Sequence, residues 1–174
     1  FVLPLHSEVT TPSTARPEFE GWAKPDVVLM ITGQQYGYIE PCGCTGLSNQ
    51  KGGLARRDTL LQTLRQQRGW DVIPLDAGNQ IRRVGAQAAI KFQFTINALR
   101  QMKAAAVGLG PDDLRLHVTD LLAELADSTN DQGVSDLFVS ANANPFGFVA
   151  THRVIVANGW RIGVTSVLGE QALA

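Results

Sequence analysis

Val27-Val28-Leu29-Met30-Ile31 is a continuous apolar run bounded by polar and Gly-rich sequence. A short run of this kind is typical of a strand whose two faces are both covered. A Gly-rich loop follows at residues 33–53, and leucines then recur at helical spacing over residues 53–67. We expect an amphipathic helix there that ends at Gly69. This strand, loop and helix form the first unit of an α/β chain.

The same alternation repeats along the chain. Further runs of strand length lie at residues 72–75, 104–109 and 137–140, and helical patterns lie at residues 87–102 and after Pro111. Pro74 fits a strand end or edge better than a strand centre. Asn158-Gly159 separates apolar segments at 153–157 and 161–167, which predicts a β-hairpin. The order predicts an α/β fold: a largely parallel sheet with helices on both faces, plus a C-terminal β-hairpin.

Length and charge limit the classes of function. At 174 residues the chain is long enough for one buried domain and too short for two. The net charge of −1 is spread over both signs, which argues against a nucleic-acid surface. The basic doublets Arg56-Arg57 and Arg82-Arg83 are expected at solvated helix or loop ends. No stretch approaches the roughly 18 apolar residues that a membrane span needs.

The domain is expected at residues 25–174, after a leader or linker at 1–24 that is rich in Pro, Ser and Thr. The leader lacks the basic start of an intact signal peptide, and equally fits what remains after such a signal is removed. In parallel sheets the site lies beyond the carboxyl ends of the strands. The loops at 33–53, 77–85 and 110–113 are therefore the candidate site.

Four segments in these loops carry a family resemblance. They are Gln34-Gln35-Tyr36-Gly37, Gly52-Gly53-Leu54-Ala55-Arg56-Arg57, Leu75-Asp76-Ala77-Gly78-Asn79 and Gly110-Pro111-Asp112-Asp113. Their order and spacing resemble the N-terminal half of a 5′-nucleotidase-type, calcineurin-like metallophosphoesterase. The corresponding family motifs are Asp-x-His-Gly, Gly-Gly-x-Ala-Arg, Gly-Asp and Gly-Asn-His followed by an acid. The resemblance covers about residues 25–169, and implies that fold in a partial domain of a longer protein.

The resemblance also shows which residues are changed. Two-metal phosphoester hydrolysis needs carboxylates and imidazoles that hold two cations about 3.5–4 Å apart. Gln34 is neutral where an Asp would bind a metal, and Tyr36 stands in the place of a His and keeps its proton at neutral pH. Asn79 replaces a bridging carboxylate, and Pro111 has neither an amide side chain nor an N–H group. We therefore expect a chain that is not a nucleotidase.

Three carboxylates survive near the supposed site, namely Asp76, Asp112 and Asp113. One interpretation gives them structural roles, as a strand-end hydrogen bond and as charges at a helix N-terminus. The other is a hydrolase with a reduced site, in which Asp76 and Asp112 or Asp113 hold one cation.

Cys42 and Cys44 are the two cysteines of the chain, with Gly43 alone between them. Three interpretations stay open: a labile or structural disulfide, a Cu or Zn or redox site, and buried thiols. The segment lacks the Cys-x-x-Cys-His pattern of c-type haem attachment. A closed metal site would need further ligands such as His117, His152, Asp76, Asp112 or a second chain. Both histidines are otherwise expected as isolated surface or interface residues.

The run from Gly37 to Cys44, together with residues 52–57, resembles a narrower branch of the family. In that branch the domain precedes multihaem cytochrome c regions in exported bacterial proteins. The resemblance implies a non-catalytic accessory module of a periplasmic or cell-envelope electron-transfer protein. Its partners would be a cytochrome c-type domain or a redox protein, with haem only outside this chain. The alternatives are the reduced-site hydrolase and a structural or oligomerising domain that forms a homo-oligomer.

Overall fold

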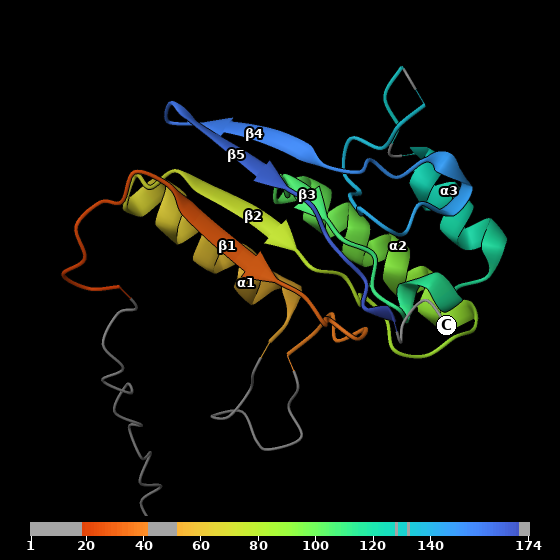
Figure 1. Ribbon diagram of the computed structural model, residues 1–174. Helices are drawn as coiled ribbons and strands as arrows, with labels where there is room; N and C mark the ends of the chain where they lie inside the picture. Colours follow the sequence, from red (N-terminus) through yellow and green to blue (C-terminus); the bar gives the residue numbers. More distant parts are fainter. Residues whose placement is uncertain (1–18, 42–51, 128, 132, 171–174) are drawn as a thin grey trace, which may run out of the picture.

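A parallel three-stranded sheet lies at the centre of the molecule (Figure 1). The computed structural model describes residues 19–41, 52–127, 129–131 and 133–170. The strands are β1 (Val28–Thr32), β2 (Val72–Asp76) and β3 (Ala106–Val107), in the order β1-β2-β3. An isolated parallel bridge between Val107 and Phe138 extends the sheet where the sequence predicts a fourth strand. The carboxyl ends of the strands therefore meet at one edge of the sheet.

The helices pack on one face of this sheet. They are α1 (Leu54–Gln62), which continues as the π-helical turn η2 (Thr63–Gln67), then α2 (Ala86–Gln101) and α3 (Val118–Asp127). Short 3₁₀ turns lie at η3 (Asp113–Arg115) and η4 (Pro145–Gly147). Leu61 and Leu64 pack with Val72 of β2, while Phe92 and Ile96 of α2 pack with Leu121 and Leu125 of α3. The leucine and aromatic spacing thus buries one stripe of each helix.

The hairpin of β4 (Arg153–Ala157) and β5 (Trp160–Val164) covers the other face (Figure 1). Asn158 and Gly159 both have positive φ, 47° and 81°, as a two-residue type I′ turn requires. Ile155 and Ile162 pack in one cluster with Ile73 and Leu75 of β2 and Ala106 of β3. The α/β class, the parallel sheet and the hairpin are confirmed. In the described part of the chain, however, a hairpin rather than a helix covers this second face.

β2 is the central strand, and Pro74 lies in its middle, which corrects the expectation of a strand end or edge. The Pro74 carbonyl accepts the N–H of Ala105 at 2.9 Å, so Pro74 faces the β3 side of β2. In a parallel strand the nitrogen of a residue faces the same side as its carbonyl. The pairing of β2 with β3 begins only at Leu75 and Ala106, so the position of the missing N–H of Pro74 lies just before that pairing. No ladder hydrogen bond is lost there.

β1 is an edge strand and is not covered on both faces as expected. Leu29 and Ile31 remain 43% and 67% exposed, because the hairpin lies over β2 and β3. The helix expected after Pro111 begins only at Val118, behind the short turn η3. Among the described residues, no helix is long and apolar enough to cross a membrane.

Candidate functional site

Three loops meet beyond the carboxyl ends of the strands, as the sequence predicts. The first two are joined by backbone hydrogen bonds of 2.7–3.0 Å, from the N–H groups of Gln34, Tyr36 and Gly37 to the carbonyls of Gly78, Asn79 and Gln80. The third loop joins the second through Asp113, whose carboxylate accepts the N–H of Asn79 at 2.7 Å. The loops that carry Gln34, Tyr36, Asn79 and Asp113 therefore form one connected structure.

Three of these positions have a left-handed backbone. The φ angles of Gln34, Tyr36 and Asn79 are 55°, 51° and 59°. Residues other than glycine rarely adopt positive φ, and such strain persists only where the surroundings fix it. The backbone hydrogen bonds between the loops fix it here. Nothing in the sequence pattern predicts these conformations.

Asp76 ends β2 with a side chain that has no exposed surface. Its Oδ2 accepts hydrogen bonds from Arg57 and from the Thr32 hydroxyl, both at 2.7 Å. Its Oδ1 accepts the N–H of Gly78 at 2.9 Å and the Gln80 side-chain amide at 2.5 Å. An ionised carboxylate has about four lone-pair sites. Protein donors thus occupy all four sites of Asp76.

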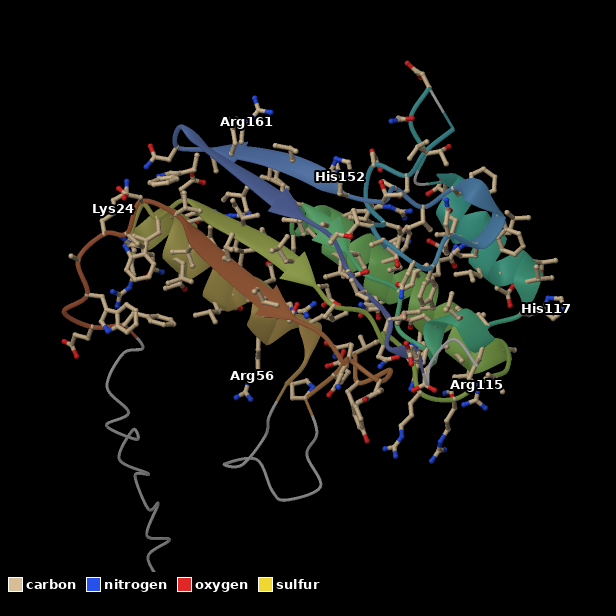
Figure 2. The ribbon with its side chains drawn as sticks, viewed as in Figure 1. Lys24, Arg56, Arg115, His117, His152 and Arg161 are labelled. Atoms are coloured by element: carbon tan, nitrogen blue, oxygen red, sulfur yellow. The ribbon has the colours of Figure 1, made fainter. Side chains whose placement is uncertain are left out.

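Arg57 is the site residue that the sequence analysis assigned wrongly. Its side chain is only 11% exposed, and Nη2 forms an ion pair with Asp76 at 2.7 Å. Arg57 lies four residues before Leu61, which is fully buried, so both lie on the buried face of α1. That spacing is the signal that could have found it. Arg56, one residue away, is exposed, and Figure 2 shows it pointing away from the ribbon, as expected for a solvated helix end.

Asp113 is fully buried and holds the second and third loops together. Oδ1 accepts the N–H groups of Gln80 at 2.8 Å and Ile81 at 3.3 Å. Oδ2 accepts those of Asn79 at 2.7 Å and Gly110 at 2.9 Å. Burial raises the pKa of this carboxyl to about 6, while the four backbone hydrogen bonds lower it. All four of its acceptor sites are again used within the chain.

Asn79 and Gly110 fit closely against each other. The Asn79 Oδ1 accepts the N–H of Asp112 at 3.1 Å. A Cβ on Gly110 would lie 2.1 Å from this same oxygen, so only glycine fits at that position. The Asp112 side chain is 25% exposed, and its carboxylate lies 3.4 Å from Arg115. Of Asp76, Asp112 and Asp113, Asp112 is thus the acid whose side chain solvent reaches, and its carboxylate lies beside the Arg115 guanidinium.

The donor set at the strand ends does not fit two metal ions. Gln34 and Asn79 have neutral amide side chains, Tyr36 offers a phenol, and the carboxylate oxygens of Asp76 and Asp113 already accept hydrogen bonds from other groups of the chain. No group of three or more His, Cys, Asp or Glu suitable for a metal ion occurs among the described residues. The geometry therefore supports a structural interpretation of Asp76 and Asp113.

Cys42 and Cys44 lie outside the described residues, so their three interpretations stay predictions. The described residues that flank their loop lie close together, because a Cβ on Gly53 would meet the Pro41 ring at 2.9 Å. His117 and His152 are both exposed, and Figure 2 shows them on well-separated parts of the molecule. His117 Nδ1 lies 2.8 Å from the Thr119 hydroxyl at the start of α3. The two histidines therefore do not share one site.

Three solved structures share the fold of this chain. A 5′-nucleotidase precursor from Thermus thermophilus superposes with a TM-score of 0.61 at 23% identity, over 80% of this chain and 28% of that chain. The fold is 5′-nucleotidase-like. A Haemophilus influenzae NAD nucleotidase gives a TM-score of 0.54 at 14% identity, over 83% of this chain and 27% of the other. The Thermus thermophilus sulfate thiohydrolase SoxB gives 0.60 at 11% identity, over 87% and 40%.

These similarities show the fold alone, because all three sequence identities are low. The chain spans between 27% and 40% of the length of these structures. No protein-family model matches the chain, and no curated protein matches it in sequence. The expected metallophosphoesterase-like fold is thus confirmed, and activity has to be argued from the site itself.

Proposed function

We propose that this chain is a non-catalytic pseudoenzyme module, which binds a redox partner or a soft metal and does not hydrolyse phosphate esters. One observation carries the proposal: the Asp76 carboxylate, at the end of the central strand, is filled by four protein donors. One of these donors is the guanidinium of Arg57. A catalytic cation at this carboxylate would have to displace it.

Electrostatics support the same conclusion. A divalent cation bound to Asp76 would lie within a few ångströms of the Arg57 guanidinium, which is 2.7 Å from the carboxylate. Like charges at such a distance repel strongly in a poorly solvated site. The Arg57 side chain is almost fully buried, so it cannot move into solvent without breaking its packing. The ion pair with Arg57 therefore favours a structural role for Asp76 over metal binding.

The biological setting is the second half of the proposal. The Glu40-Pro41-Cys42-Gly43-Cys44 run with residues 52–57 supports an accessory role in an exported bacterial electron-transfer protein with multihaem cytochrome regions. Cys42 and Cys44 would form the Cu, Zn or redox site, because two nearby thiolates suit soft cations. Pro41 and Gly53 flank this loop close to the first turn of α1, at the same sheet end as Arg57.

A hydrolysis assay tests the first half. The purified chain is incubated with Mn²⁺, Zn²⁺ or Mg²⁺ and either nucleotides or p-nitrophenyl phosphate, and released phosphate or nitrophenol is measured. We expect no turnover above that of the metal alone. Circular dichroism checks that both variants are folded. Turnover that folded Asp76→Ala loses, and that the exposed control Asp120→Ala retains, would establish the reduced-site hydrolase and overturn the proposal.

Elemental analysis tests the second half. The reduced chain is loaded with Cu(I) or Zn²⁺, desalted and analysed for bound metal, alongside Cys42→Ser, Cys44→Ser and the control His117→Ala. We expect stoichiometric metal that both serine variants lose and the histidine variant keeps. Reduced protein without stoichiometric metal would reject the soft-metal site.

A structural or oligomerising role has one observation in its favour. Ile31 of β1, Val156 of β4 and Val167 are each 67–70% exposed although they are large aliphatic residues. Contiguous apolar patches mark contact surfaces, whereas single exposed aliphatic residues are ordinary, so the oligomeric state has to be measured. Sedimentation analysis of the wild type and of Val156→Asp decides this role, since a dimer that the variant dissociates would support it.

A further inference from the structure

A cationic pocket lies between the loop after β1 and the start of α2. Its volume is about 370 Å³, and the polar residues that line it are Tyr36, Tyr38, Arg82, Arg83, Gln87 and Lys91. Among the described residues, no carboxylate lines it. The pocket thus places three formal positive charges and two phenol groups around one hollow.

The three cations have no acidic partner within the described part of the chain. Ion pairs there use Arg57, Arg100 and Arg115, which all contact carboxylates. Arg82 and Arg83, in contrast, are exposed beside each other in one loop. Gathering unpaired like charges costs free energy, and a bound anion removes that cost.

Local contacts hold two of these cations at the pocket. The Arg82 guanidinium lies 5.8 Å from the ring centroid of Tyr36, within the range of a cation–π contact. A Cβ on Gly37 would meet Lys91 Cδ at 3.2 Å and Nζ at 3.7 Å, so the Lys91 side chain lies over the Gly37 backbone. These contacts already restrict the two side chains, so less side-chain entropy is lost when an anion binds.

The start of α2 adds to the positive potential. α2 has 16 residues, no acidic residue in its first turn and no side-chain cap at Gly85. The positive end of the helix dipole is therefore not neutralised by the helix itself. Gln87 and Ala88, in this first turn, line the pocket.

We propose that this pocket binds a small anion that carries a tetrahedral oxyanion group with two negative charges, a phosphate or a sulfate. Arginine side chains match the geometry of such oxygens and donate charge-assisted hydrogen bonds to them. The volume lies within the range of small-ligand pockets, which favours a small anion over an extended polymer. This inference goes beyond the proposed function, because it depends neither on the cysteines nor on the absence of hydrolysis.

Calorimetric titration of the whole chain with inorganic phosphate and, separately, with sulfate tests the proposal. A chloride titration at matched ionic strength is the reference. We expect saturable binding of at least one of the two dianions and none of chloride. Tighter phosphate binding assigns a phosphate ligand, and tighter sulfate binding assigns a sulfate ligand.

Neutral variants locate the binding. Arg82→Gln, Arg83→Gln and Lys91→Gln are each expected to weaken binding about tenfold, the effect of losing one charge-assisted hydrogen bond. Arg161→Gln removes the same charge from the exposed surface of β5 and is expected to leave the affinity unchanged. Circular dichroism checks that the variants are folded. The proposal is overturned if neither dianion binds saturably, or if Arg161→Gln weakens binding as much as the pocket variants do.

Discussion

Replacing Arg57 by methionine is expected to lower the free energy of unfolding by about 3 kcal/mol. The Arg57 side chain is 11% exposed and that of Asp76 is fully buried, with 2.7 Å between their charged atoms. Removing one partner of a buried ion pair costs roughly 3–5 kcal/mol, because the other charge is left without compensation. Asp76 keeps three neutral donors, from Thr32, Gly78 and Gln80, so we expect the lower end of that range.

The assay is urea unfolding at pH 7, followed by far-ultraviolet circular dichroism. With a denaturant slope of about 2 kcal/mol per molar urea, the midpoint should fall by roughly 1.5 M. Asp76→Asn tests the partner with little change of shape, and the double variant leaves neither charge buried. The two single losses should therefore not add, with a coupling free energy of about 2 kcal/mol. Arg161→Met on β5 is the exposed control and should stay within about 0.5 kcal/mol of wild type.

Two results would refute this reasoning. One is an Arg57→Met variant as stable as the Arg161→Met control. The other is a double variant whose loss equals the sum of the single losses. Either result would mean that the guanidinium does not compensate the charge of Asp76 in solution. Asp76 would then be held by its three neutral donors alone, and no positive charge would oppose a cation beside it.

Three further predictions concern the loops and the core. Because Asp113 has a folded pKa of about 6, above its ordinary 3.8, the folded state binds this proton more tightly. The contribution of Asp113 to the free energy of unfolding should therefore rise by about 1.4 kcal/mol as the pH falls from 7.5 to 5. Urea unfolding at the two pH values should show this rise in the wild type and not in Asp113→Asn. Gly110→Ala should lower the melting temperature markedly, since its Cβ would lie 2.1 Å from Asn79 Oδ1, whereas Gly163→Ala, with open space, should not. Phe92→Ala, at a position 1% exposed, should cost about 3–5 kcal/mol in urea unfolding, and a loss below about 1 kcal/mol would contradict the core assignment.

Much of the candidate site was predictable, although the partners of its residues were not. The sequence assigned the candidate site to three loops, and hydrogen bonds join these loops in the structure. The metal positions that the resemblance assigns to Gln34, Tyr36, Asn79 and Pro111 stay predictions. The sequence left two interpretations of Asp113 open, a charge at a helix start or a ligand of a single cation, whereas the carboxylate accepts four backbone N–H groups from two loops. Backbone donors carry no signature in the sequence. A contact of this kind becomes visible only once the path of the chain is known.

The amino-acid pattern alone is enough to predict the order of the elements and the turn of the hairpin. Apolar periodicity and the Asn158-Gly159 pair act within a few residues, so they can be interpreted without knowing the path of the chain. Three features become visible only in the folded chain: Pro74 lies in a central strand, the hairpin covers the second face, and Arg57 neutralises Asp76. These outcomes join residues far apart in sequence, such as Arg57 and Asp76 at 19 positions or Asn79 and Asp113 at 34. Burial and charge pairing depend on which segments meet, and that is a property of the whole fold.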